Sequence, residues 1–510
     1  MALDLIDLAR GPVPERLSAQ VCIVGSGPGG ATAARTLARA GIDVLVLEEG
    51  GDFTGPQLTQ REGEMYDQLY MDRGGRATAD MSITVMQGRA LGGGSVINAS
   101  DVVPLHDGVL RHWQKRYGLT ELSPQAMEPY RALALADLSA NRPLEAQLNR
   151  NNRLLRAGTE ALGWRGEVML HNRSGCVGTG VCLIGCPFNA KRNARFVAIP
   201  EAAAAGARFV VRARLERIEQ ATAGRKRLRV RALDAKGYHE REELTVDADV
   251  VILAANAIGS AQILLRSGIG NEHVGRHLSL QPQLPLTALF EEEVRSFRGI
   301  PQAYAVTEFE DLDHAEHGWW GFRIESISGT PGVVAGNLPV YGERATELMQ
   351  AYPFTASSLL LMPDEPVGHL EVESNGRLRI HYRLTEELAA RLRRAIRAGS
   401  EAYFAAGARE VFVPIVPPLR IRRSADLAAV DAIDFRPATA PLISAHQQGS
   451  VRFAPSASDG GADPDGQVYG TKDVYVFDSS GFPTTSSSHT MTPIITVSRY
   501  LADKLATRLA

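Results

Sequence analysis

Three of the four cysteines of the chain lie in one glycine-rich stretch, GCVGTGVCLIGCPFNAK, at residues 175–191. Cys176, Cys182 and Cys186 follow the spacing C-x5-C-x3-C, and a proline comes directly after the last of them. Three thiolates on one loop could converge on an iron–sulfur cluster, and cysteine followed by proline occurs among ferredoxin ligands. The same loop could instead hold packed free thiols. Zinc is disfavoured because only three ligands are at hand.

Length and composition restrict the class of protein. A chain of 510 residues is too long for one hydrophobic core, so two or three packed domains are expected. A net charge of −3 argues against nucleic-acid binding, and no run of eighteen apolar residues predicts a membrane span. Residues 1–20 do not resemble a signal peptide, which predicts a cytoplasmic location with reduced thiols, unless the chain is exported with a partner subunit. A disulfide in the cysteine loop is therefore disfavoured.

The elements that must position any reactive groups begin with QVCIVGSGPGGATAARTLARAGIDVLVLEE, residues 20–49. The apolar run Val21–Val24 predicts a buried parallel strand, in which Cys22 is a core residue. A glycine-rich turn and an alanine-rich amphipathic helix follow, and Ile42–Leu47 predicts a second strand. This strand–loop–helix–strand order is typical of a Rossmann-like dinucleotide-binding domain, and hence of an α/β fold.

Each part of this motif has a role in binding a dinucleotide. Gly25 permits a tight turn, Gly27 lets a pyrophosphate approach the backbone, and Gly30 lets helix and strand pack closely. The start of the helix offers free N–H groups and the positive end of its dipole. Glu48 follows the second strand, where it can accept hydrogen bonds from the adenosine ribose. The motif alone does not distinguish FAD from NAD.

Three further segments resemble those of the glucose–methanol–choline (GMC) flavoprotein oxidoreductases. Residues 88–98, GRALGGGSVIN, resemble the second glycine-rich signature of that family. Residues 250–270, VVILAANAIGSAQILLRSGIG, resemble the segment that closes over the adenine side of FAD, and residues 474–505 resemble the closing flavin segment. The resemblance implies FAD as cofactor, with contacts from Gly92, Gly93, Gly94, Ser95, Asn98, Leu215, Ala254, Ala255, Asp478 and Pro493.

The resemblance also implies the reacting groups. His446, in PLISAHQQG, stands where GMC enzymes place their active-site histidine, and His489 stands at the position of their second histidine or asparagine. A neutral imidazole is a suitable base near pH 7, so His446 is expected to remove a hydroxyl proton while His489 positions the substrate oxygen. The family normally has proline directly after the second residue, whereas Thr490 stands there and the proline comes later. A three-residue slip would make Thr492 the partner instead.

The C-terminal segment ends in an amphipathic pattern that predicts a helix. Proline suits the first helical position, where its missing N–H has no consequence, so the helix is expected to begin at Pro493. In the family, this helix points its N-terminus at the flavin, where its dipole would stabilise negative charge on the reduced ring.

The cysteine loop resembles two groups of the family. Its spacing and the downstream PFNAK are similar to catalytic subunits of bacterial FAD-dependent glucose dehydrogenases, which hold a three-iron cluster on three such cysteines. It is equally similar to long-chain alcohol oxidases, whose related stretch has a further cysteine at the position of Thr179. A 3Fe–4S cluster on Cys176, Cys182 and Cys186 and a packed loop of free thiols both stay open.

The resemblance implies two domains, each discontinuous in the chain. The FAD-binding domain is expected at 1–110, 190–275 and 440–510. A substrate-binding cap with a mixed sheet and helices is expected at 111–189 and 276–439, including the cysteine loop. Aromatic residues of the cap that could line a pocket over the flavin are Phe297, Tyr304, Trp319, Trp320 and Phe322.

The expected activity is FAD-dependent oxidation of an alcohol to a carbonyl, by hydride transfer to flavin N5. The substrate is a small molecule, a lipophilic alcohol or a sugar, and the electrons pass to oxygen or to another acceptor such as a partner protein. The family also contains hydroxynitrile lyases and a fatty-acid photodecarboxylase, which carry out no net alcohol oxidation. The histidine pair favours alcohol oxidation over these alternatives.

Overall fold

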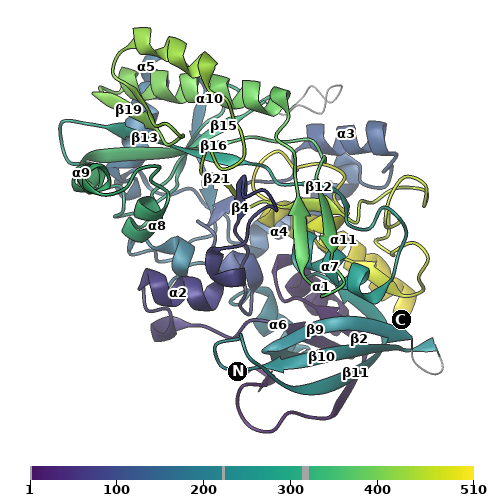
Figure 1. The fold of residues 1–510 in the computed structure, drawn as a ribbon. Coiled ribbons are helices and arrows are strands. Elements are labelled where there is room, and N and C mark those ends of the chain that lie inside the picture. Colours follow the sequence, from purple (N-terminus) through teal and green to yellow (C-terminus); the bar gives the residue numbers. More distant parts are fainter. Residues whose placement is uncertain (1–2, 221–223, 313–320) are drawn as a thin grey trace.

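The computed structural model describes residues 3–220, 224–312 and 321–510. Figure 1 shows two halves, one built on a sheet that includes β2, β9, β10 and β11, the other on a sheet that includes β13, β15, β16 and β19. Their buried apolar side chains form one continuous cluster. Trp319 and Trp320, two of the candidate pocket residues, lie outside the described residues.

The first sheet contains the predicted dinucleotide-binding motif. Its central strands are parallel and buried at their carboxyl ends, which explains their continuous apolar runs. An antiparallel ribbon extends the sheet on one side. The order is β1 (Leu5–Asp7), β8 (Arg208–Val211), β3 (Val44–Glu48), β2 (Arg16–Val24), β11 (Glu240–Leu253), β10 (Lys226–Leu233) and β9 (Ala213–Gln220), and β23 (Val474–Val476) pairs with β11.

The second strand of the motif starts later than the sequence predicts. β3 begins at Val44 because Ile42 belongs to the end of the preceding helix, α1 (Pro28–Arg39). The Ile42 N–H donates to Leu37 O at 3.2 Å, and Gly41 adopts the left-handed conformation (φ +83°) that commonly ends helices. The predicted order of strand, loop, helix and strand is nevertheless present, and the predicted α/β fold class is confirmed.

Helices α1, α4 (Pro124–Asp137), α6 (Ala198–Ala204) and α11 (Met491–Leu509) pack on one another beside this sheet. The last of these corrects the predicted helix start, because α11 begins two residues before Pro493. Proline is tolerated there since the first four N–H groups of a helix have no intrahelical acceptor. Of the described helices, none is both long and apolar enough to cross a bilayer.

The second sheet is mostly antiparallel, and Figure 1 shows α5 and α10 lying over it. Two of its strands, β4 and β21, come from chain segments expected in the cofactor domain, so the two halves are interwoven; the domain boundaries stay a prediction. The order is β20 (Leu419–Ile421), β19 (Glu410–Val413), β13 (Gln283–Leu289), β16 (Thr355–Leu361), β15 (Arg323–Ser326), β14 (Tyr304–Val306) and β6 (Gly166–Val168), with β21 (Leu442–Ser444) between β13 and β4 (Ile83–Val85).

Small strand pairs join the halves. β12 pairs with β22, which brings the chain around residue 446 against the start of the second sheet. The remaining elements with their bounds are β5 (Asp101–Val102), β7 (Leu170–His171), β12 (Arg276–Ser279), β17 (His369–Val372), β18 (Leu378–His381), β22 (Gln448–Ser450), α2 (Glu62–Leu69), α3 (Asp107–Tyr117), α5 (Arg150–Ala161), α7 (Asn256–Ser267), α8 (Pro331–Gly336), α9 (Glu343–Ala351) and α10 (Glu386–Ala405).

Candidate active site

The two glycine-rich loops face each other with no side chains between them. Gly25 has φ +99°, and a Cβ there would collide with the carbonyl oxygen of Ala254. A Cβ on Gly30 would likewise collide with Gly25 O, so close packing of helix and strand requires glycine. A Cβ on Gly93 would lie 2.7 Å from the Cα of Gly27. The result is a cradle of bare backbone at the start of α1, which suits a pyrophosphate.

The second loop is held in shape by serine side chains. Gly92 has φ +106°, and its N–H donates to Ser26 Oγ at 3.0 Å. Ser95 donates its hydroxyl to Gly92 O at 2.6 Å and accepts the N–H of Ala194 at 3.1 Å. Asn98 follows the loop and donates to Met491 Sδ, at the first turn of α11, at 3.3 Å. These bonds connect the loop to the first glycine turn and to the terminal helix.

Glu48 lies at the carboxyl end of β3, beside the first glycine turn. Its Oε2 accepts the N–H of Ser26 at 3.1 Å and the hydroxyl of Ser26 at 2.6 Å, and its Oε1 accepts the N–H of Gly50 at 2.8 Å. Burial raises the pKa of this carboxyl group, although the hydrogen bonds act in the opposite direction. Oε1 still has an acceptor site for a ribose hydroxyl.

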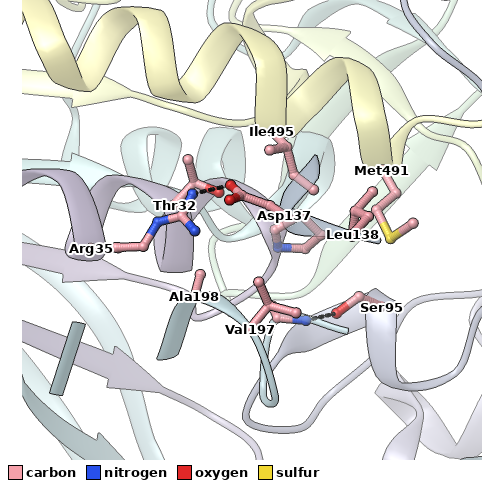
Figure 2. A pocket seen from close by; sticks show the side chains of 11 residues that line it. Thr32, Arg35, Ser95, Asp137, Leu138, Val197, Ala198, Met491 and Ile495 are labelled. Carbon is pink, nitrogen blue, oxygen red and sulfur yellow. Dashed lines mark hydrogen bonds and ion pairs between the residues drawn. The ribbon is translucent and has the colours of Figure 1, made fainter. Parts of the chain in front are cut away.

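A small cavity lies where these segments meet (Figure 2). Pro28 and Ser95 from the two loops line it together with Met491 and Ile495 of α11. Figure 2 shows Arg35 of α1 paired with Asp137 at the end of α4 along its wall. The cavity therefore marks the junction of the three segments that the sequence assigns to the cofactor.

The C-terminal segment is tied to the adenine-side segment through Asp478. This buried carboxylate accepts the hydroxyl of Ser260 at 2.6 Å and the N–H of Ser480 at 2.8 Å, and burial raises its pKa. Ser260 in turn accepts the N–H of Ala255 at 3.1 Å. Leu215 is a buried residue of β9. Ser260 thus connects the C-terminal segment at Asp478 to the segment that contains Ala255.

Several hydroxyl groups before and within the first turn of α11 have no partner. They are fully buried, and no described residue accepts or donates a hydrogen bond to them: Thr485 Oγ1, Ser486 Oγ, Ser488 Oγ and Thr492 Oγ1. Buried polar groups are normally hydrogen-bonded, so such a cluster fits a polar ligand that completes it. Together with the glycine cradle, these residues fit a flavin dinucleotide.

His446 and His489 meet at the boundary of the two halves. His446 lies between β21 and β22, and His489 lies two residues before α11. Their rings are 4.7 Å apart, centroid to centroid, and cross at 70°. Both histidines are partly accessible to solvent, although they lie deep in the protein. Burial at this depth acts to lower the pKa of each ring. The alternative partner, Thr492, lies in the first turn of α11.

Hydrogen bonds assign the tautomer of His446. The side-chain nitrogen of Gln281 donates to Ser487 O at 2.7 Å, so its oxygen faces His446 Nδ1, 2.5 Å away. Nδ1 must then carry the proton, and Nε2 keeps its lone pair. The side-chain amide of Gln283 also lies 3.1 Å from Nδ1. Because Nδ1 carries a proton, the amide oxygen of Gln283, rather than its nitrogen, is the atom that suits this position. Burial and then the charge of His489 lower the pKa of His446 to about 3, so the ring is neutral at ordinary pH.

The surroundings of His489 shift its pKa in the opposite direction. Its Nε2 lies 3.1 and 2.9 Å from the two carboxylate oxygens of Glu325, which is fully buried in β15. Burial alone would lower the pKa of His489, but the charge and the hydrogen bond of Glu325 outweigh it and raise the pKa. The pKa of Glu325 is correspondingly lowered. The ion pair therefore favours the protonated form of His489, and no hydrogen-bond partner of its Nδ1 is found among the described residues.

Glu325 belongs to a buried ion network. Its oxygens also accept Arg323 Nε at 2.6 Å and the side-chain nitrogen of Gln302 at 2.5 Å. Arg323 bonds onward to Glu310 at 3.1 Å and to Glu167 at 3.1 Å. A buried carboxylate with this many donors stays ionised, which keeps the ion pair with His489 in place.

The residue that orients His446 is itself oriented by a buried acid. Gln281 has φ +46°, a left-handed conformation that is uncommon for residues other than glycine. Asp364 accepts the N–H groups of Leu280 and Gln281, each at 2.9 Å, and the hydroxyl of Tyr382 at 2.6 Å. Burial raises the pKa of Asp364 to about 6. These bonds hold the Gln281 side chain against the imidazole.

Glu325, Gln281, Gln283 and Asp364 were not predicted as site residues. One signal was available for the first of them. Arg323 and Glu325 lie two residues apart in a strand, and so on one face of it; since the strand is buried, this charged pair needs partners. The two glutamines and Asp364 carry no comparable pattern in the sequence.

The three cysteines lie on the surface side of this region. Cys176, Cys182 and Cys186 are free and partly exposed. Within the described ranges, no group of three or more histidine, cysteine, aspartate or glutamate side chains is arranged to hold a metal ion. Lys191 fastens the loop to the second glycine-rich loop, donating to Cys182 O at 3.0 Å and Val96 O at 2.9 Å. The structure thus gives no support to the predicted iron–sulfur cluster.

Three of the aromatic residues predicted to line a substrate pocket lie within the described residues, and each of them packs against another ring or in the core. Phe322 stacks on Phe309 with centroids 4.7 Å apart, and Phe297 stacks on Tyr352 at 5.2 Å. Tyr304 is buried in β14. These contacts assign the three residues to packing.

Comparison with known proteins gives the family. GMC oxidoreductase family models match residues 66–283 and 364–498, and an NAD(P)-binding Rossmann-like domain matches residues 23–86. An uncharacterized GMC-type oxidoreductase of Mycobacterium tuberculosis is 32% identical over 515 residues, covering 97% of this chain and 77% of that protein. The chain belongs to the GMC oxidoreductase family. The predicted family is therefore confirmed, and the protein is an oxidoreductase.

Other GMC proteins show how far the likeness extends. A long-chain-alcohol oxidase of Arabidopsis thaliana is 24% identical over 513 residues, covering 96% of this chain and 67% of that enzyme. A formate oxidase of Aspergillus oryzae, studied for FAD modification, superimposes with a TM-score of 0.72 at 15% identity, covering 97% and 99% of the two chains. The second likeness shows that both halves of this GMC oxidoreductase share the fold of that oxidase.

Proposed function

We propose that this protein is an FAD-dependent oxidoreductase that converts the CH–OH group of an alcohol to a carbonyl. The observation that carries this proposal is the pair of imidazoles 4.7 Å apart, with the pKa of His446 lowered by burial and the pKa of His489 raised by Glu325. One offers a lone pair to a hydroxyl proton, and the other offers an N–H to the oxygen. Alcohol oxidation needs both groups at the same oxygen atom.

The residues that would hold FAD are those of the glycine cradle and the terminal segment. The N–H groups around Gly27 and Gly93 suit the pyrophosphate, Glu48 suits the adenosine ribose, and the unpartnered hydroxyls before α11 suit the flavin. When bound, FAD accepts the hydride that leaves the carbinol carbon. The start of α11 supplies a positive dipole end at the same place.

His446 is proposed as the base. Gln281 holds Nδ1 as a donor, so Nε2 points its lone pair away from the amide and is available to the substrate hydroxyl. Because burial keeps this ring neutral at ordinary pH, no proton has to leave it before reaction. A base oriented in this way removes the hydroxyl proton as the carbon is oxidised.

His489 is proposed to bind the substrate oxygen. Glu325 holds Nε2 and keeps the ring protonated, so Nδ1–H can donate to the oxygen as negative charge develops there. This role complements that of His446, since one oxygen can give its proton to one imidazole and accept a hydrogen bond from the other.

The relatives support an alcohol as substrate. A long-chain-alcohol oxidase matches this chain over 96% of its length, which favours a lipophilic alcohol over a sugar. Oxygen is proposed as the acceptor on the same likeness, and a protein acceptor stays the alternative.

The test is anaerobic reduction of the purified protein. A panel of long-chain alcohols, short alcohols and sugars is added to the FAD-loaded chain, and flavin absorbance near 450 nm is followed. Bleaching by an alcohol, with formation of its aldehyde or ketone, supports the proposal. An unchanged oxidised spectrum across the panel contradicts it and leaves the lyase and photodecarboxylase alternatives, which light and cyanohydrin substrates then separate.

A further inference from the structure

Arg212 is a buried arginine at the edge of the cofactor cradle. It directly follows β8, whose last residue, Val211, pairs with Glu48. Its N–H donates to Gly50 O at 3.0 Å, and its backbone has φ +60°, a left-handed conformation rarely adopted by arginine. Only 5% of the residue is exposed. The backbone thus turns a long cationic side chain inward at the end of the sheet.

The guanidinium group of Arg212 has no polar partner in the described part of the chain. It makes no hydrogen bond or ion pair, and Nη1 is shielded from solvent. The guanidinium lies over the ring of Phe53, whose centroid is 5.4 Å away. The nearby carboxylate of Glu48 is occupied by Ser26 and Gly50. A buried charged group without hydrogen bonds is strongly destabilising, so such groups normally have a ligand.

Glycines make the space around this group. A Cβ on Gly51 would lie 2.5 Å from Nη2, and a Cβ on Gly237 would lie 2.9 Å from Nη1. A second buried guanidinium, that of Arg89, lies at the same spot, but its donors reach Gly237 O at 2.9 Å and Lys236 O at 3.0 Å. Both terminal nitrogens of Arg89 therefore have carbonyl partners, although its Nε has none, whereas the buried Nη1 of Arg212 has no partner.

The strand order gives the direction in which Arg212 lies. The sheet runs β8, β3, β2, with the glycine cradle after β2, Glu48 at the end of β3 and Arg212 after β8. In Rossmann-like domains the pyrophosphate sits at the first turn and the acid after the next strand takes the ribose. One strand further in the same direction is where the adenosine extends beyond its ribose.

We propose that Arg212 binds the adenosine moiety of the dinucleotide, with Nη1 donating to an acceptor of the ribose or the adenine. This inference rests on the proposed function, because it assumes a dinucleotide in the cradle. It assigns the unpartnered guanidinium a ligand and explains why glycine stands at positions 51 and 237. Arg212 is then a determinant of affinity for the adenosine half.

The first test uses ADP, which contains this half and lacks flavin. The full chain, freed of flavin, is titrated with ADP by calorimetry as wild type, Arg212→Met and Arg214→Met. Arg214 is the matched control, because it lies two residues away and its guanidinium pairs with Glu216 and Glu240. Loss of a charge-assisted hydrogen bond should weaken ADP binding roughly 10- to 100-fold in Arg212→Met. The control should stay within about twofold of wild type.

The second test separates ligand binding from a structural role. Removing an unpartnered buried charge should leave the melting temperature of the flavin-free protein unchanged or higher, whereas the rise produced by FAD should be smaller than in wild type. A loss of ADP affinity below about tenfold, or a flavin-free Arg212→Met protein that melts below wild type, would overturn the inference.

The two proposals fail in different ways. If wild type binds FAD and ADP but is never reduced by an alcohol, the proposed activity fails and Arg212 keeps its role. If alcohols bleach the flavin of wild type and Arg212→Met binds ADP as wild type does, only the inference on Arg212 fails. If wild type binds neither FAD nor ADP, both are wrong.

Discussion

The histidine pair and the cysteine loop both bring reactive side chains together, but their surroundings differ. Each ring of the pair has one nitrogen fixed by a named partner, Gln281 for His446 and Glu325 for His489. The cysteine loop is fastened through backbone carbonyls, by Lys191, while its sulfur atoms are left partly exposed. Reactive side chains form a site only where other side chains fix their direction and charge.

The difference is also electrostatic. Around the pair, a buried carboxylate network and burial push two identical side chains toward opposite protonation states. Around the loop, the nearby charged groups are the cations Lys191 and Arg173 together with the carboxylate of Asp101, and burial lowers the pKa of Lys191 to about 8. An acid and a base that act together need side chains whose pKa values are shifted in opposite directions at one place. The histidine pair meets this condition.

The largest expected effect is that of His446→Ala. Loss of the base should slow flavin reduction by an alcohol about 10²- to 10⁴-fold, while the flavin stays bound. Stopped-flow absorbance gives the rate, and the protein-to-flavin absorbance ratio gives the content. His239→Ala, in an exposed loop, is the control. Reduction within about twofold of wild type would remove His446 from the base role.

Glu325→Gln tests the other half of the pair. A raised pKa means that His489 is charged below it and loses its proton as pH rises, so reduction should fall on the basic side of the profile. Without the carboxylate, this basic limb should move to lower pH by about one unit or more, with a rate loss of roughly 10-fold above pH 7. Glu167→Gln, at the exposed end of the network, should leave the limb in place. An unmoved limb in Glu325→Gln would contradict an imidazolium held by Glu325.

Gln281→Leu tests the orientation of the base. Without this acceptor, the His446 ring can rotate and its proton is no longer fixed on Nδ1. We therefore expect flavin reduction to slow about 10-fold, with little change in flavin content. Gln283→Leu should have a smaller effect, because the longer contact of 3.1 Å is the weaker one. The ratio of the two rates measures which glutamine sets the tautomer, and a larger loss in Gln283→Leu would reverse the assignment.

The smallest effect is expected for Cys182→Ser. Since no metal-holding group is found among the described residues, the rate of flavin reduction should stay within about twofold of wild type. Iron and acid-labile sulfide are measured on both proteins. About three irons per chain in wild type, lost in the variant, would establish the cluster and make the two regions parts of one electron path.

Much of the cofactor half could be predicted because its signals are local. The turn at Gly25, the helix after it and the acid at Glu48 are neighbours in sequence and in space. The predicted start of β3 was wrong by two residues. The N–H of Ile42 is bonded to Leu37 O at the end of α1, and the apolar pattern of the sequence does not reveal such a contact. The start of α11 was wrong for a similar reason, because proline is tolerated anywhere in the first turn.

The shell around the histidines could not be predicted, because it comes from distant segments. Glu325 is 164 residues from His489, and Gln281 is 165 residues from His446. The pairing of β12 with β22, the pairing of β13 with β21 and the position of β15 beside β16 bring them together. Sequence spacing carries no information on such contacts unless the fold is already known.

The strand β21 leads directly to His446 and is hydrogen-bonded between β13 and β4. His446, the proposed proton acceptor, is therefore attached to the half that is expected to face the substrate, although residues 440–510 are expected in the other half. A rotation of one half against the other would drag this strand, and with it the imidazole. The reacting geometry therefore depends on the two halves keeping a fixed position relative to each other.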